Sequence, residues 1–80
     1  MTYASAISSR IKNLCRERKI SINQLAIRAG LNQSTVDNIV HERTKSAGIR
    51  SLHLIAQGFQ MTVSELLNFD EMNNGKFEDE

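Results

Sequence analysis

Polar residues with helix-capping chemistry divide this chain into short helices. Ser21 and Thr62 are each followed three positions later by a side chain that can reach back to the helix start, Gln24 and Glu65. Asn32 stands in the same capping position before a third apolar, helix-spaced segment. Sustained alternation of apolar and polar residues, the pattern of strands, is missing from the sequence. The chain is therefore predicted to be all-α, with boundaries that rule out one long helix.

Apolar residues recur at helical spacing along most of the chain. The expected helices cover about 4–19, 22–29, 33–41, 48–59 and 63–68. Eighty residues suit one domain, here expected over 1–69, followed by an acidic, polar C-terminal tail over 70–80. In the helix over 48–59, the residues expected to form the buried stripe are Ile49, Leu52, Ile55, Ala56 and Phe59.

Residues 22–41 combine two short helices with a three-residue turn. Ala26 is small enough for the helices to cross closely, and Gly30 can adopt the left-handed conformation that ends the first helix. This combination is typical of a helix-turn-helix. Its expected core consists of Leu25, Ala26, Gly30, Leu31, Val36 and Ile39. The second helix then keeps a polar outer face.

The pattern Ser21-x-x-x-Leu25-Ala26-x-x-x-Gly30-Leu31-x-x-Ser34-Thr35-Val36 resembles the Cro/repressor-type (XRE) helix-turn-helix family. The resemblance extends over roughly residues 7–68. It implies a compact five-helix bundle of the lambda-repressor-like kind and a sequence-specific DNA-binding transcriptional regulator, in particular a repressor. Such proteins commonly bind operator DNA as homodimers. The chain departs from the family at Ile22, where a phosphate-contacting glutamine is common, and at Ala47, where a proline is common.

The helix over 33–41 is expected to enter the major groove with its first residues nearest the bases. The expected base contacts are Gln33, Ser34, Thr35 and Asn38, because amide side chains can pair with adenine and hydroxyls with several base edges. The expected contacts to the DNA backbone are Asn32, Arg43, Thr44 and Lys45, with Arg10 and Arg28 as weaker candidates. Asp37 is expected to point away from the duplex.

The net charge of +1 conceals two segments of opposite sign. Residues 1–50 carry nine lysines and arginines against three acidic residues, whereas residues 51–80 carry one lysine against six acidic residues. A basic body favours a polyanionic partner. The acidic tail leaves a second possibility open, an antitoxin-like or other protein-interaction module. Leu67, Phe69 and Met72 fit either an exposed dimer contact or a return onto the chain's own core.

Other chemistry has little support in the sequence. A single cysteine, Cys15, is expected to be a core residue, and His41 and His53 are not spaced as metal ligands. A glycine-rich phosphate loop and an arranged catalytic triad are both missing, so we expect no enzyme, cofactor or metal. Neither a leader peptide nor a long apolar run is present. We therefore expect a cytoplasmic protein without a membrane segment.

Overall fold

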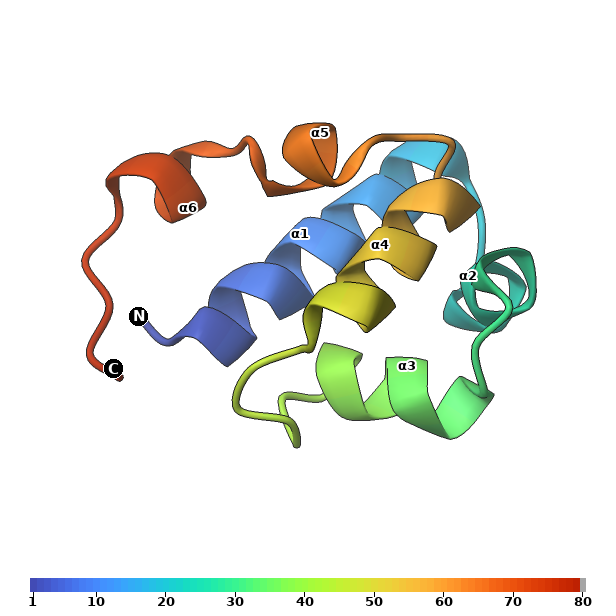
Figure 1. The fold of residues 1–80 in the computed structure, drawn as a ribbon, viewed down its shortest axis with the longest axis horizontal. Coiled ribbons are helices and arrows are strands. Elements are labelled where there is room, and N and C mark those ends of the chain that lie inside the picture. Colours follow the sequence, from blue (N-terminus) through green and yellow to red (C-terminus); the bar gives the residue numbers. More distant parts are fainter. Residues whose placement is uncertain (80) are drawn as a thin grey trace.

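A computed structural model describes residues 1–79, which form helices joined by short connections (Figure 1). Its helices are α1 (Tyr3–Arg18), α2 (Ile22–Ala29), α3 (Gln33–Val40), α4 (Ile49–Gly58), α5 (Val63–Leu67) and α6 (Asp70–Asn74). Within this range the chain contains no strand, which confirms the all-α class. The first five helices agree with the predicted ones to within one or two residues. The sixth lies in the segment predicted to be a tail, whose last residue, Glu80, lies outside the described residues.

The helix starts show which capping predictions were right. Ser21 Oγ accepts from the backbone N of Gln24 at 3.0 Å, and Gln24 Oε1 accepts from the backbone N of Ser21 at 2.8 Å. Thr62 and Glu65 form the same reciprocal pair at the start of α5. The capping bond predicted for Asn32 is wrong, because its side chain makes no such bond. The Asn32 side chain is exposed and turns to solvent, where it remains available for another partner.

The core lies among the first five helices: α2 packs on α4 and α3, α3 also packs on α1, and α5 packs on α4 (Figure 1). Its fully buried side chains include Ile11, Leu25, Val36, Ile55, Phe59 and Leu66. The closest approach of α2 and α4 occurs at Gly58. A Cβ at this position would lie 3.2 Å from both the backbone N of Ala29 and Leu25 Cδ1. A small residue here lets these two helices pack at short range.

Two predictions about apolar residues are decided by the structure. Ile49, predicted to be buried, is 69% exposed. It is the first residue of α4, and helical spacing alone could not tell whether another element reaches that end of the helix. Leu67, Phe69 and Met72 are half-buried and pack against the core, which confirms that they return onto the chain itself.

Two arginines cap the C-terminal ends of helices. Arg10 donates from Nε to Leu66 O and from Nη2 to Glu65 O, both at 2.9 Å, and its guanidinium lies 5.3 Å from the centre of the Phe69 ring. Arg18 donates to the carbonyl of Phe59 and lies over the ring of that residue. Both arginines bond carbonyls at the C-terminal end of a helix, where backbone donors become scarce. Arg10 was a weaker candidate for a DNA contact, and the structure instead engages it inside the fold.

The C-terminal segment after α6 runs along the start of α1. The rings of Tyr3 and Phe77 stack with their centres 4.1 Å apart. The α-amino group of Met1 lies 2.7 Å from Glu78 Oε1, and the Tyr3 backbone N donates to Asp79 Oδ1 at 3.2 Å. The N-terminal and C-terminal ends of the described chain are therefore in contact with each other (Figure 1).

Candidate nucleic-acid interface

The turn between α2 and α3 has the geometry predicted for a helix-turn-helix. Gly30 has φ 69° and ψ 29°, the left-handed conformation. Its N–H donates to Ile27 O, and the N–H of Leu31 donates to Ala26 O, which together form a Schellman motif at the end of α2. Ala26 is only 2% exposed. Of the other predicted core residues of the motif, Leu25, Val36 and Ile39 are buried and Leu31 is half-buried against the core.

Helix α3 has one buried face and one face open to solvent. Val36, Ile39 and Val40 point into the core. Ser34 and Asn38, one turn apart, lie on the opposite side of the helix. Ser34 is exposed, as is Gln33 in the first turn, whereas Thr35 and Asn38 are half-buried. In Figure 1, α3 lies at one edge of the molecule, so its outer face is not covered by another helix.

The connection between α3 and α4 folds back onto the last turn of α3. We call residues 42–48 the basic loop. The backbone N atoms of Arg43 and Thr44 both donate to Asn38 O, at 2.8 and 3.3 Å, and Arg43 Nη1 lies 3.4 Å from Asn38 Oδ1. Glu42 adopts a positive φ of 62° at the bend. These bonds attach the basic loop to the residue at the centre of the outer face.

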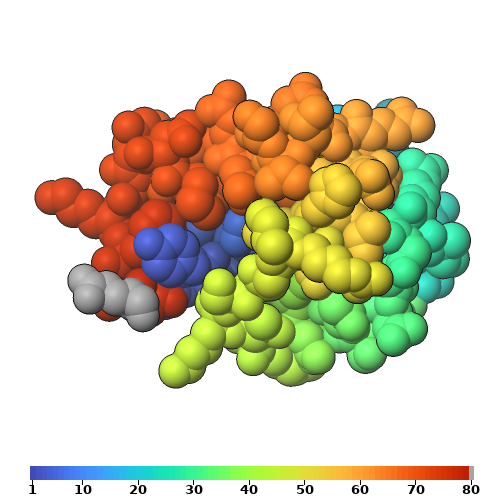
Figure 2. Space-filling model, in the orientation of Figure 1, coloured from blue at the N-terminus to red at the C-terminus, as the bar shows by residue number. Residues whose placement is uncertain are grey.

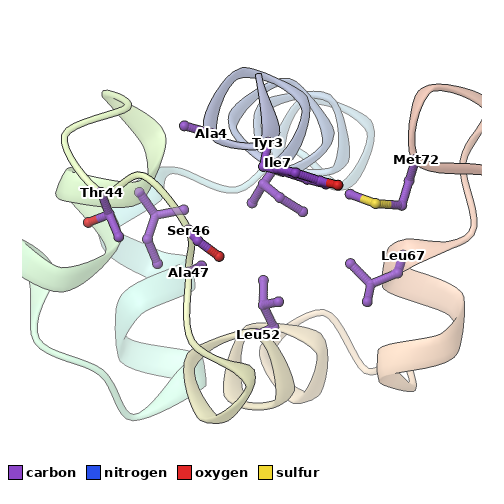
Figure 3. A pocket seen from close by; sticks show the side chains of 10 residues that line it. Tyr3, Ala4, Ile7, Thr44, Ser46, Ala47, Leu52, Leu67 and Met72 are labelled. Atoms are coloured by element: carbon purple, nitrogen blue, oxygen red, sulfur yellow. The ribbon is translucent and has the colours of Figure 1, made fainter. Parts of the chain in front are cut away.

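The predicted backbone-contacting residues differ in how freely they project. Asn32, Arg43 and Lys45 are exposed. Thr44 is half-buried and lines a cavity behind the basic loop, so it is less free than its neighbours (Figure 3). Arg28, the other weaker candidate, is exposed in the last turn of α2.

Sequence reasoning left two exposed side chains out of the candidate site. His41 follows Asn38 by three residues and Ser34 by seven, so it extends the outer face of α3 by one turn. Helical spacing had placed it on this polar face, although not among the expected DNA contacts. Arg50 is exposed in the first turn of α4, directly after the basic loop. Its proximity to the candidate site follows from the course of the loop, which has no local sequence signal.

The structure also locates the lone cysteine and the potential metal ligands of residues 1–79. Cys15 is buried in the core, and burial raises the pKa of its thiol. Among residues 1–79 no cluster of three histidine, cysteine, aspartate or glutamate side chains is positioned to hold a metal ion. None of the helices described here has the length and apolar character needed to cross a membrane.

Comparison with known proteins agrees with this geometry. Residues 10–72 match a family model described as a Cro/C1-type HTH DNA-binding domain. The match covers more than half of the chain and includes α2, the turn, α3, the basic loop and α4. No curated protein matches the chain.

Proposed function

The chain belongs to the family of Cro/C1-type helix-turn-helix DNA-binding domains, and from this membership we propose that it is a sequence-specific transcriptional repressor. Its recognition element is α3, inserted in the major groove of double-stranded DNA. The observation that carries the proposal is the uncovered polar face of α3, with the basic loop hydrogen-bonded to Asn38 at its centre. The family match by itself supports the coarser statement, a DNA-binding regulator.

The base-reading residues of the proposal are Gln33, Ser34, Thr35 and Asn38. Gln33 is exposed in the first turn of α3, the part of a recognition helix that lies nearest the bases. Amide side chains can bond adenine through N6 and N7, and each such pair discriminates against other bases by ~1–3 kcal/mol. The contact of Arg43 with Asn38 Oδ1 leaves the amide nitrogen of Asn38 free to donate.

The DNA backbone would be contacted by Asn32, Arg43, Thr44 and Lys45. Exposure of Asn32, Arg43 and Lys45 supports this role most directly. Contacts of this kind position a protein on the duplex without reading its sequence. They also make affinity depend on salt, because each neutralised phosphate releases condensed counterions.

Titration of DNA binding tests these roles after a bound sequence has been selected from a random duplex pool. Gln33→Ala should cost ~1–3 kcal/mol on the selected site and relax its sequence preference. Lys45→Ala should weaken binding to all sequences alike and reduce the salt slope by about one unit. Lys76 is an exposed lysine in the C-terminal segment, and Lys76→Ala is the matched control. It should leave the DNA affinity and the salt slope unchanged. Unaltered affinity in both test variants would place the docking face elsewhere.

We also propose that the protein acts as a homodimer on half-sites about 34 Å apart. A single small domain makes few DNA contacts, so pairing would supply the second half-site. Leu67, Phe69 and Met72 are half-buried against the chain's own core, so they offer less apolar surface to a partner than fully exposed residues would. Sedimentation at micromolar concentration with and without a two-half-site duplex measures this directly. A single protomer bound to the selected duplex at saturation would argue against the dimer.

A further inference from the structure

A cavity of about 160 Å³ lies behind the basic loop, between the start of α1, the first half of α4 and the C-terminal helices (Figure 3). Its apolar wall is formed by side chains from α1, α3, α4, α5 and α6, namely Ile7, Ile39, Leu52, Leu67 and Met72. None of the described residues that line it carries a charge.

Three of the residues that line this apolar space carry a hydroxyl group, Tyr3, Thr44 and Ser46. Figure 3 shows the Ser46 hydroxyl turned toward the space between the basic loop and Leu52. The Ser46 side chain is exposed to solvent, so a ligand hydroxyl bonded to it would take the place of water. The cavity therefore offers one apolar volume and a small number of neutral polar groups, the usual combination in small-molecule sites.

Size and chemistry together narrow the class of ligand. An apolar cavity of about 150 Å³ in another protein accommodates benzene. A charged group would lose part of its hydration against this apolar wall, and no lining residue carries an opposite charge to replace it. We propose that this cavity binds a small, neutral, monocyclic aromatic molecule with one hydroxyl group, of the phenol class, whose hydroxyl bonds Ser46.

A route into the cavity is present at the surface. A more open depression adjoins it and shares Tyr3, Ala4 and Ser46. Its outer border includes Glu42, Lys45 and Asp79, so it opens beside the basic loop. In Figure 2 the side chains near the start of the chain lie between the C-terminal segment and the basic loop, where this depression is found.

Occupancy of the cavity would act on DNA binding, a consequence that rests on the proposed function. Thr44, Ser46 and Ala47 line the cavity, while Arg43 and Lys45 of the same loop are the proposed phosphate contacts. A ligand packed against the loop restricts the motion of the loop. DNA binding then costs less conformational entropy, because the loop is already ordered. The ligand would therefore increase DNA affinity, by a factor of about five, the lower end of common allosteric couplings.

Titration of the 80-residue chain with phenol, toluene and benzoate, followed by methyl NMR, tests the site without DNA. Phenol at millimolar concentration should give saturable shifts at Ile7, Leu52 and Met72, and benzoate should bind at least tenfold more weakly because of its charge. Ser46→Ala should weaken phenol binding roughly 2- to 12-fold, the range expected for one hydrogen bond, and leave toluene unaffected. Absence of saturable shifts with both phenol and toluene would overturn the proposal.

A blocking variant provides an independent test. Ala4→Leu adds three carbons at a lining position and should abolish phenol binding. Asn13→Leu is the matched control, because nine residues along α1 place it on the opposite side of that helix. Equal phenol binding by both variants would contradict the assignment. Phenol affinity that falls as protein concentration rises would show a second copy of the chain in the cavity and would also overturn it.

The regulatory consequence has its own readout. Affinity for the selected duplex is measured with and without saturating phenol in the wild type and in Ala4→Leu. A gain of about fivefold in the wild type alone is expected. Phenol binding with unchanged DNA affinity would overturn the coupling, whereas a protein that binds phenol but no DNA would contradict the proposed function and leave the cavity assignment intact.

Discussion

Replacement of Gly30 by alanine isolates the backbone conformation on which the helix-turn-helix depends. Gly30 has φ 69°, and a Cβ added there would meet nothing within 4 Å. The cost of alanine is therefore conformational and not steric. A left-handed backbone costs an ordinary L-residue roughly 1–2 kcal/mol. Alanine also reduces the conformational entropy of the unfolded chain, which by itself stabilises the folded state by about 0.4–1 kcal/mol. The net loss of unfolding free energy is about 1 kcal/mol, equivalent to a fall in Tm of roughly 4–8 °C.

Gly48→Ala is the matched control for this experiment. Gly48 also has open space around its Cβ position, but its φ is −68°, which alanine adopts without strain. It is the N-cap of α4, where alanine is somewhat less favourable than glycine. That small penalty opposes the stabilisation that comes from the lower entropy of the unfolded chain. The unfolding free energy should therefore change by no more than about 0.5 kcal/mol. Gly30→Asn should be milder than Gly30→Ala, because asparagine tolerates the left-handed region.

Urea and thermal denaturation, followed by circular dichroism at the helical band, measure these differences. Two-state unfolding is expected of a domain of this size. Equal stability of Gly30→Ala and Gly48→Ala would refute the reasoning, because it would mean that the left-handed turn imposes no conformational requirement. A loss several times larger than about 1 kcal/mol in Gly30→Ala would also contradict it, since steric conflict is missing from the structure.

Three further substitutions or measurements test the contacts around the motif. Arg10→Ala should lower the unfolding free energy by roughly 1–3 kcal/mol through lost hydrogen bonds to Leu66 and Glu65. It should leave the salt slope of DNA binding unchanged, unlike Lys45→Ala. Hydrogen bonds from the backbone N–H and the hydroxyl of Thr62 lower the pKa of Glu65, so the stability it adds is present at neutral pH and is lost as pH falls through that lowered value. Glu65→Gln keeps a capping acceptor, and its unfolding free energy should decline less on acidification than that of the wild type. Cys15, whose thiol pKa is raised by burial, should react with a maleimide much more slowly in the native protein than in denaturant, and fast native labelling would contradict its place in the core.

Local chemistry made much of the fold predictable. Ser21 and Thr62 carry their own capping partners three residues away, so their helices begin where short-range hydrogen bonds require. Asn32 failed as a side-chain cap although its helix begins at the predicted residue. The polar face of α3 followed from the positions of Val36 and Ile39, since a helix with one buried side exposes the other.

Other features depended on elements that are distant in the sequence. In the sequence, Arg10 is one of several basic residues that could contact DNA. In the structure, α5 places the Leu66 carbonyl within hydrogen-bond distance of Arg10. The sequence left open whether the acidic segment is ordered, and in the structure Phe77 stacks on Tyr3 at the other end of the chain. The cavity behind the basic loop is assembled from five helices and could not be anticipated from any one of them.

The sequence by itself determined the all-helical class, the helix starts and the turn at Gly30, because hydrogen bonds and backbone preferences act over three or four residues. Only the tertiary structure decided which charged and apolar side chains remain available. Ile49 is exposed and Arg10 is engaged because burial depends on which element arrives from elsewhere in the chain. The spacing of apolar residues along one helix does not show which other element will pack against it.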